Sequence, residues 1–339
     1  MGDTAAVEPL TRALQDTDSG VRATAAASLG RIGDPSAVQP LVNTLKDKVK
    51  EVRAGAAEAL IKIGQPSVEP LVAALSDDDA ALRWRAGEAL VRIGQPSVES
   101  LSVALLTDRD RQVRASAAEV LGKIASPAAI GPLISSLKEN DAGVRAKVSQ
   151  ALVKLGPSSV EPLIAALHDS RLQTRAADAL IKVGSHAIPP LISALREEDP
   201  SFRDAVANVL TKLGKPGIAP LARAANGPDP LVRREAAIVL AAMGDVRAIE
   251  PLMAQLKTRD PDTRQRAAQA LVSLGKPAAE ALVGLLSERD ETVRQAATET
   301  LVGIGKPAVD PLGRLLDHPD EGVRRGALTI LDRIRSRAI

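Results

Sequence analysis

The sequence repeats itself about every thirty residues, and this repetition constrains the fold more than any other feature. One usually apolar residue in each copy serves as an anchor for the alignment, and successive anchors lie 28 to 31 residues apart. The anchors are Val21, Val52, Leu82, Val113, Val144, Leu172, Phe202, Val232, Thr263, Val293 and Val323. A leucine stands eight residues after every anchor, from Leu29 to Leu331. The pattern predicts eleven tandem copies of one small structural unit.

Each repeat reads as two amphipathic helices. In the third repeat, residues 67–75 form a short first helix and residues 79–94 contain a longer second helix. Apolar residues of a second helix fall at the anchor and four, eight and eleven residues later, a spacing that buries one face. We expect Ser67 to cap the first helix, which places Pro70 in the first turn, where no hydrogen-bond donor is lost.

Two polar columns, each formed by the residues at one position of successive repeats, flank the anchors. An aspartate stands three residues before the anchor in ten of the eleven repeats, where Val49 is the exception, and this is the expected capping position of the second helix. An arginine follows the anchor in ten repeats, and Gln173 replaces it in the sixth. Glycines such as Gly64 follow most second helices, where a left-handed residue ends a helix at little cost.

Short connections make successive helices antiparallel neighbours, and repeats that cannot bury their apolar faces alone must stack. We therefore predict an all-α fold, a right-handed α-solenoid (superhelix) of about eleven two-helix repeats, with residues 1–339 as a single array. The second helices should line its concave side, and the shortened sixth repeat should bend it. The predicted repeats are approximately 4–33, 34–64, 65–94, 95–125, 126–156, 157–184, 185–214, 215–244, 245–275, 276–305 and 306–339.

The pattern Asp-x-x-Val-Arg-x-x-Ala-x-x-x-Leu-x-x-Ile-Gly, which runs from about residue 5 to residue 334, resembles the HEAT-like repeat of the phycobilisome-lyase type. In that family the aspartate and arginine columns are understood as a buried ladder between neighbouring repeats. The resemblance implies this structural role for Asp79, Arg83, Asp110, Arg114, Asp141 and Arg145. A row of arginines for phosphate groups is the functional alternative, which the regularity of the column disfavours.

The sequence offers few groups for catalysis, and we predict that the protein is not an enzyme and has no catalytic, cofactor or metal site. There is no cysteine or tyrosine, and His168, His186 and His318 fall in separate repeats near predicted loops. Deoxyhypusine hydroxylases, which are built from similar repeats, hold two irons with His-Glu pairs, and no His-Glu dipeptide occurs in this chain. Aromatic residues make up 1% of the chain, which leaves little to hold the chromophore of a phycobilin lyase.

The charge and the hydropathy of the sequence limit the partners and the location that can be expected. The chain has 44 basic and 42 acidic residues, and its net charge of +2 is too small to attract nucleic acid or anionic lipid as a whole. No signal peptide or membrane span is predicted, and the lack of cysteine fits a cytoplasmic location. We expect a monomer, with a dimer through the terminal repeats as an alternative.

A basic row lies ten residues after the anchor in the first seven repeats, from Arg31 to Lys212. A binding role would direct it to an acidic peptide, a phosphorylated segment or a nucleic-acid backbone. The structural alternative, which we favour, pairs four of these cations with an acid four residues earlier in the same helix. Such acids are Glu58, Glu88, Glu119 and Asp178.

Trp84 is the one tryptophan, and it stands where other repeats have alanine. Trp84 therefore either anchors a partner in a groove or packs locally against the adjacent second helix. Because interfaces are enriched in tryptophan and arginine, we predict a partner-binding groove at Trp84, Arg85, Arg92, Lys123, Lys147, Lys154, Arg175 and Lys182. The predicted function is a non-catalytic scaffold or adaptor that binds a protein or peptide, with acidic partners favoured. The first alternative is a lyase-like or hydroxylase-like repeat enzyme that acts on a chromophore or a protein side chain. The second alternative, which the lack of aromatic platforms for stacking bases disfavours, is a protein that binds a nucleic-acid backbone.

Overall fold

The computed structural model describes residues 4–337, and all regular elements of this range are helices. The contacts divide the chain into two compact halves, of which one ends at Val183 and the other begins at Gly184. We call them the N-terminal half and the C-terminal half and describe each by itself.

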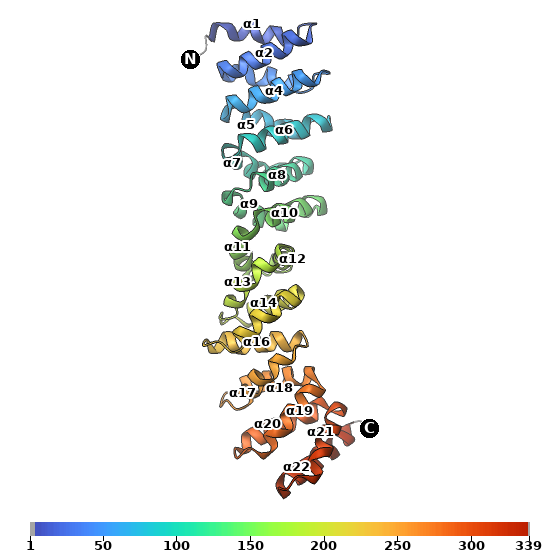
Figure 1. The fold of residues 1–339 in the computed structure, drawn as a ribbon. Coiled ribbons are helices and arrows are strands. Elements are labelled where there is room, and N and C mark those ends of the chain that lie inside the picture. The colour runs from blue at the N-terminus through green and yellow to red at the C-terminus, as the bar shows by residue number, and fades with distance from the viewer. Residues whose placement is uncertain (1–3, 338–339) are drawn as a thin grey trace. The chain divides into compact units, whose positions relative to one another are not determined.

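The N-terminal half consists of six helix pairs in two layers. The first helices pack on one another in one layer, the second helices do so in the other, and each first helix packs on its own second helix (Figure 1). The helices are α1 (Val7–Ala13), α2 (Ser19–Ile32), α3 (Val38–Thr44), α4 (Lys50–Ile63), α5 (Val68–Ala73), α6 (Ala80–Ile93), α7 (Val98–Thr107), α8 (Arg111–Ile124), α9 (Ile130–Ser135), α10 (Ala142–Leu155), α11 (Val160–Ala165) and α12 (Gln173–Val183).

The C-terminal half continues the same alternation of first and second helices. Second helices again pack on second helices, as α16 does on α18 and α18 does on α20. The helices are α13 (Ile188–Ala194), α14 (Pro200–Leu213), α15 (Lys215–Ala224), α16 (Pro230–Ala242), α17 (Ile249–Leu256), α18 (Pro261–Leu274), α19 (Lys276–Leu282), α20 (Glu291–Ile304), α21 (Val309–Gly313) and α22 (Glu321–Arg337). The predicted all-helical solenoid of helix pairs is confirmed.

Most second helices begin and end at the capping aspartates and the glycines that were predicted. Asp79 caps α6, because its carboxylate accepts a hydrogen bond from the Ala81 amide at 2.8 Å. After α4 the chain turns at Gly64, whose φ of 76° lies in the left-handed region that favours glycine. Ala125 occupies this place after α8 and adopts a φ of 55°, although it is not a glycine.

The predicted cap of the first helix is wrong. Residues Gln65–Ser67 form a 3-10 turn, α5 begins only at Val68, and the fully buried Ser67 side chain makes no capping bond. The corresponding Ser97 hydroxyl donates instead to the Leu90 carbonyl at 3.2 Å, at the end of the preceding second helix. The serine therefore points inward, toward the layer of second helices. Pro70 does lie in the first turn of α5, as predicted.

The core is built from the repeated aliphatic residues. The leucine eight residues after the anchor is 0% exposed in the first ten repeats, so this column forms the centre of the packing. Phe202 replaces an aliphatic anchor and is 2% exposed, which confirms its place in the core. In the sixth repeat α12 has 11 residues, whereas its neighbour α10 has 14.

One column sets how closely neighbouring second helices approach. A Cβ atom added to Gly30, on α2, would lie 2.6 Å from the Cα atom of Ala59 on α4, so these backbones are in direct contact. Gly122 and Ala151 bring α8 and α10 together in the same way. The position of Gly30 is occupied by Ile61 on α4, whose side chain lies between α4 and α6.

Candidate binding groove

A groove of about 380 Å³ lies between α4 and α6 on the face formed by the second helices. Ala54, Ala57, Ile61 and Ala89 supply apolar lining. Charged side chains and the single tryptophan complete it, namely Lys50, Arg53, Glu58, Trp84, Arg85, Glu88 and Arg92. Three of the lining residues were predicted from the sequence, and the structure brings them together: Trp84, Arg85 and Arg92.

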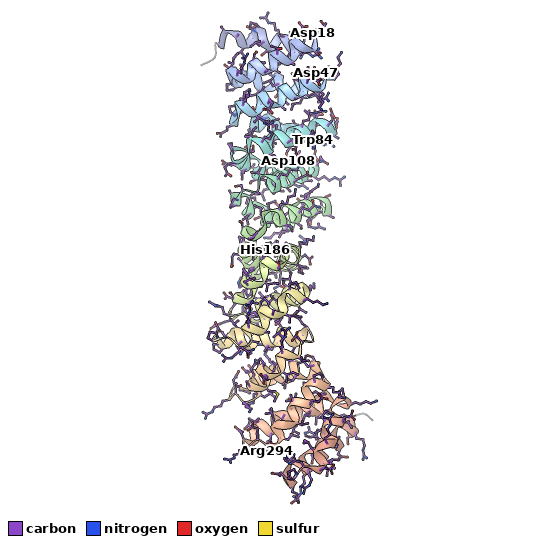
Figure 2. All side chains as sticks on the ribbon, in the orientation of Figure 1. Asp18, Asp47, Trp84, Asp108, His186 and Arg294 are labelled. Atoms are coloured by element: carbon purple, nitrogen blue, oxygen red, sulfur yellow. The ribbon has the colours of Figure 1, made fainter. Side chains whose placement is uncertain are left out.

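Trp84 projects from α6 with 64% of its surface exposed (Figure 2). Alanines such as Ala54 and Ala115 hold the same position in other repeats, so the tryptophan is an addition to the regular packing. A side chain this large loses much of its favourable apolar burial when it stays in water. The structure therefore shows Trp84 at a groove and not packed away between the helices.

Arg85 binds a backbone carbonyl and not an acid. Its Nη1 atom donates to the Leu45 carbonyl at 3.0 Å, just after the end of α3. Arg175 repeats this arrangement on α12, where Nη1 donates to the Leu137 carbonyl at 2.6 Å. Both guanidinium groups thus bind the negative end of a first helix in the preceding repeat, where cations are favoured.

Two cations of the basic row form ion pairs between repeats, whereas the predicted pairing within one helix is present at one position. Arg92 binds Glu58 of the preceding repeat, and Lys123 binds Glu88 at 2.6 Å. The predicted pairing four residues back is present for Lys123 and Glu119 at 3.4 Å. Stacking brings a cation ten residues after one anchor beside the acid six residues after the previous anchor, a proximity that the spacing along one helix cannot reveal.

The remaining predicted groove residues lie outside the groove. Lys147 binds Glu119 at 2.6 Å, and this bond is the main reason that the pKa of Glu119 lies below its usual value. Lys154 and Lys182 form no ion pair with any residue of the part that the structure describes. The eight predicted residues therefore do not form one site.

The predicted ladder takes a different form from the one that the family resemblance implied. Asp79, Asp110 and Asp141 cap their own second helices. The column arginines bind their own repeat, because Nη1 of Arg83, Arg114 and Arg145 donates to two carbonyls of the loop before the helix. Asp141 does reach the preceding repeat, but its partner there is Arg111, at 3.3 Å. The aspartates therefore do not bind the column arginines, although Arg114 does link its repeat to the next through another acid.

The link between repeats uses an acid that the sequence analysis missed, five residues before the anchor. Arg22 donates from Nε to Asp47 at 2.7 Å and from Nη2 at 3.1 Å, and Arg114 donates from Nε to Glu139 at 2.9 Å. The bond from Arg22 is the main reason that the pKa of Asp47 is lowered. Recurrence was the available signal, since acids hold this position in seven repeats: Asp16, Asp47, Asp77, Asp108, Glu139, Glu197 and Glu288.

Within residues 4–337 no three side chains of the metal-binding kinds converge as a metal site would require. None of the described helices combines the length and the apolar character that crossing a bilayer demands.

Comparison with protein families identifies the repeat. The model for HEAT repeats matches residues 1–61, 40–102, 98–181, 218–302 and 279–339. The chain belongs to the HEAT-repeat family. The model for the PBS lyase HEAT-like repeat matches residues 172–197 of this HEAT-repeat protein. No curated protein sequence matches the chain.

Solved structures resemble it distantly. The karyopherin Kap121p, bound to the extreme C-terminus of the protein phosphatase Cdc14p, is 12% identical with a TM-score of 0.39, and the match covers 99% of this chain and 46% of the karyopherin. Importin beta is 14% identical with a TM-score of 0.34, over 97% of this chain and 57% of importin beta. A structure from a study of the interaction between cadherin and beta-catenin is 17% identical with a TM-score of 0.33, over 96% and 91%.

Proposed function

We propose that this HEAT-repeat protein is a non-catalytic scaffold that binds a protein or peptide partner in the groove between α4 and α6. One observation carries the proposal: the single tryptophan of the chain is 64% exposed at a groove of about 380 Å³. Tryptophan and arginine dominate the energetic centres of protein interfaces, and Trp84 lies beside Arg85 and Arg92.

The lining indicates the chemistry of the partner. Four basic side chains and two acidic ones surround the groove, which gives the lining a net charge of +2. Arg92 and Glu58 neutralise each other in part, whereas Lys50 forms no ion pair with a described residue. We therefore expect a segment with an apolar side chain that packs on the Trp84 ring and a flanking acid directed at Lys50.

Partner capture from a cytosolic extract, followed by binding measurements with the purified partner, tests the proposal. Trp84→Ala should abolish retention of a specific protein, because truncation of an interface tryptophan typically costs at least about 2 kcal/mol. Leu328→Ala is a matched control, since Leu328 is an exposed apolar residue of a second helix, 55% exposed and outside the groove. With the purified partner, the fluorescence of the only tryptophan should change on binding.

Two results would contradict the proposal. The first is a partner that binds wild type and Trp84→Ala equally well. The second is a single-stranded oligonucleotide that binds the groove with an affinity that falls steeply with salt, which would favour the nucleic-acid alternative.

A further inference from the structure

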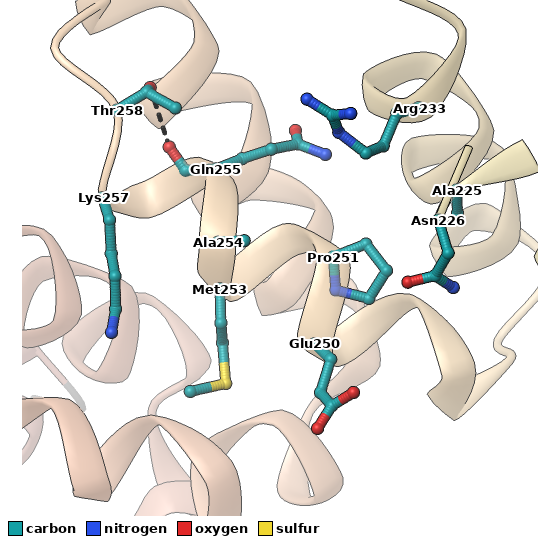
Figure 3. Close-up of a pocket in the computed structure, with 10 residues that line it drawn as sticks. All are labelled: Ala225, Asn226, Arg233, Glu250, Pro251, Met253, Ala254, Gln255, Lys257 and Thr258. Carbon is teal, nitrogen blue, oxygen red and sulfur yellow. Dashed lines mark hydrogen bonds between the residues drawn. The ribbon is translucent and has the colours of Figure 1, made fainter. Parts of the chain in front are cut away.

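A second pocket, of about 510 Å³, lies wholly within the C-terminal half. Its lining comes from the turn after α15, from the start of α16 and from α17 with the two residues that follow it. Figure 3 shows the Gln255 amide and the Arg233 guanidinium directed toward each other at one side of this pocket, with Glu250 at the opposite side.

Gln255 is a buried amide without a partner. The residue is 7% exposed, and neither its side-chain nitrogen nor its side-chain oxygen has a hydrogen bond. Such a group costs free energy unless something pairs with it. Gln255 stands three residues after the buried leucine of its first helix, Leu252, and the first eight repeats have a small residue at this position. The Thr44 hydroxyl, at this position in the second repeat, donates a hydrogen bond to the Pro40 carbonyl at 2.8 Å.

Arg233 is the one exposed arginine in the column that follows the anchors, all of whose members are described. Its Nη1 atom donates to the Gly227 carbonyl at 3.0 Å, the same loop contact that Arg22 makes with the Asp16 carbonyl. In Arg22 the remaining edge of the guanidinium, Nε and Nη2, holds the carboxylate of Asp47. The same edge of Arg233 has no partner in the described chain.

The next repeat offers this edge no acid. Thr258 stands where Asp47 and Glu139 supply the bridging acid to Arg22 and Arg114. Its hydroxyl donates to the Gln255 backbone carbonyl at 2.9 Å, so it does not replace the missing carboxylate. An arginine edge without a partner and an unpaired buried amide thus line the same pocket.

We propose that this pocket binds a peptide segment that carries an aspartate or glutamate side chain. The carboxylate of the ligand takes the place of the missing acid on Nε and Nη2 of Arg233, in the geometry that Arg22 and Asp47 show within this chain. The backbone N–H of that residue donates to Oε1 of Gln255, and the backbone C=O of the same residue accepts from Nε2, because in an extended residue these two groups lie on the same side of the chain. A carboxylate alone can accept a hydrogen bond from Nε2 of Gln255 but cannot donate one to Oε1. A peptide can do both, so the site should prefer a peptide.

The charges around the pocket agree with an acidic ligand. Lys257 is occupied by Glu288 at 2.7 Å, which leaves Arg233 as the cation with an open edge. Glu250, the acid of the lining, lies away from that edge (Figure 3). This site is separate from the Trp84 groove, and its test does not depend on the proposed function.

The probe is N-acetyl-aspartate N-methylamide, which contains one carboxylate and two peptide groups. Binding to the full chain is followed by NMR on the side-chain amide of Gln255, assigned by its absence in Gln255→Leu. We expect saturable shifts of this amide, and an affinity that falls at least about tenfold for the asparagine analogue and for Arg233→Gln, since both remove a charge-assisted hydrogen bond. Arg294→Gln, in the same column but outside the pocket, should leave binding unchanged.

A variant that adds the acid within the chain tests ligand binding in a protein that remains folded. Thr258→Asp supplies the missing acid from within the chain, keeps Arg233 and Gln255, and should abolish binding of the probe in a folded protein. The proposal is overturned if Thr258→Asp binds the probe as wild type does, or if the Gln255 amide does not respond to the probe. It is also overturned if acetate, or N-acetylglycine with its terminal carboxylate, binds as tightly as the aspartate probe.

Discussion

Two neighbouring interfaces of the N-terminal half, α2 with α4 and α4 with α6, use the same repeat pattern and have opposite characters. At the first, Gly30 lets the backbones touch, and the buried pair Arg22–Asp47 joins the repeats. At the second, Ile61 occupies the place of Gly30, the exposed pair Arg92–Glu58 joins the repeats, and a groove opens beside Trp84.

The comparison shows that the residue nine positions after the anchor influences how closely two stacked second helices approach. The side chains at the contact set the distance between helix axes. Glycine has no side chain, so the two backbones can touch, whereas a branched side chain at this position keeps the helices apart. The repeat pattern itself is unchanged, so binding surfaces can be placed along the array without disturbing the core.

The closed interface should be the more sensitive to added volume. We expect Gly30→Ala to lower the free energy of unfolding by about 2 to 3 kcal/mol, because the new Cβ atom would lie 2.6 Å from the Ala59 backbone. Urea denaturation measures this. The matched control is Gly326→Ala on α22, where a Cβ atom meets nothing within 4 Å and where alanine should stabilise the helix by about 1 kcal/mol. Equal effects of the two substitutions would break the comparison.

Loss of the buried Arg22–Asp47 ion pair should have the next largest effect on stability. Asp47→Asn should cost about 2 kcal/mol, because Arg22, which is 6% exposed, loses its charged partner. The pKa of Asp47 is lowered from an ordinary value of 3.8, so its contribution to stability is present above that pH and is lost as the pH falls below it. Denaturation between neutral pH and pH values below 3.8 should show this loss in the wild type and not in Asp47→Asn. Parallel pH profiles would contradict the assignment.

A smaller effect is expected at the groove. Arg85→Ala should lower stability by about 1 kcal/mol, since α6 loses the bond from Nη1 to the Leu45 carbonyl. Trp84→Ala should change stability less than Arg85→Ala, because Trp84 is 64% exposed. Thermal denaturation of both variants measures these losses of stability. A larger loss for Trp84→Ala than for Arg85→Ala would show that Trp84 is part of the packing.

The exposed bridge should matter least. Glu58→Gln should change stability by less than about 0.5 kcal/mol, because both side chains of the Arg92–Glu58 pair are about half exposed. Denaturation at low and high salt is the measurement, and the small effect should shrink further with salt. A loss as large as that of Asp47→Asn would remove the distinction between the two bridges.

Much of the fold could be predicted from the sequence because its cause is periodic. The leucine column, the Asp79-type caps and the glycines after the second helices are local signals that recur in almost every repeat, and the structure confirms them. The inward-facing Ser67 was wrongly predicted as a cap, because its orientation depends on the preceding second helix and not on the helix that it begins.

The candidate site was predictable only in part. Trp84 is visible in the sequence as a departure from an alanine column, and Arg92 follows from the basic row. The partner of Arg85 could not be predicted, because the Leu45 carbonyl lies forty residues away along the chain and is a backbone group. The unpaired edge of Arg233 was likewise hidden, because it shows only against the bridge that Arg22 makes to the next repeat.

The sequence by itself determined the repeating helix pair, its caps and its buried leucines, because these depend on spacings within about thirty residues. Only the tertiary structure decided which cation meets which acid, where two helices touch and where a groove remains. These contacts join equivalent positions of different repeats, and their distances depend on the volume of the side chains between the stacked helices, a property of the packing and not of the pattern.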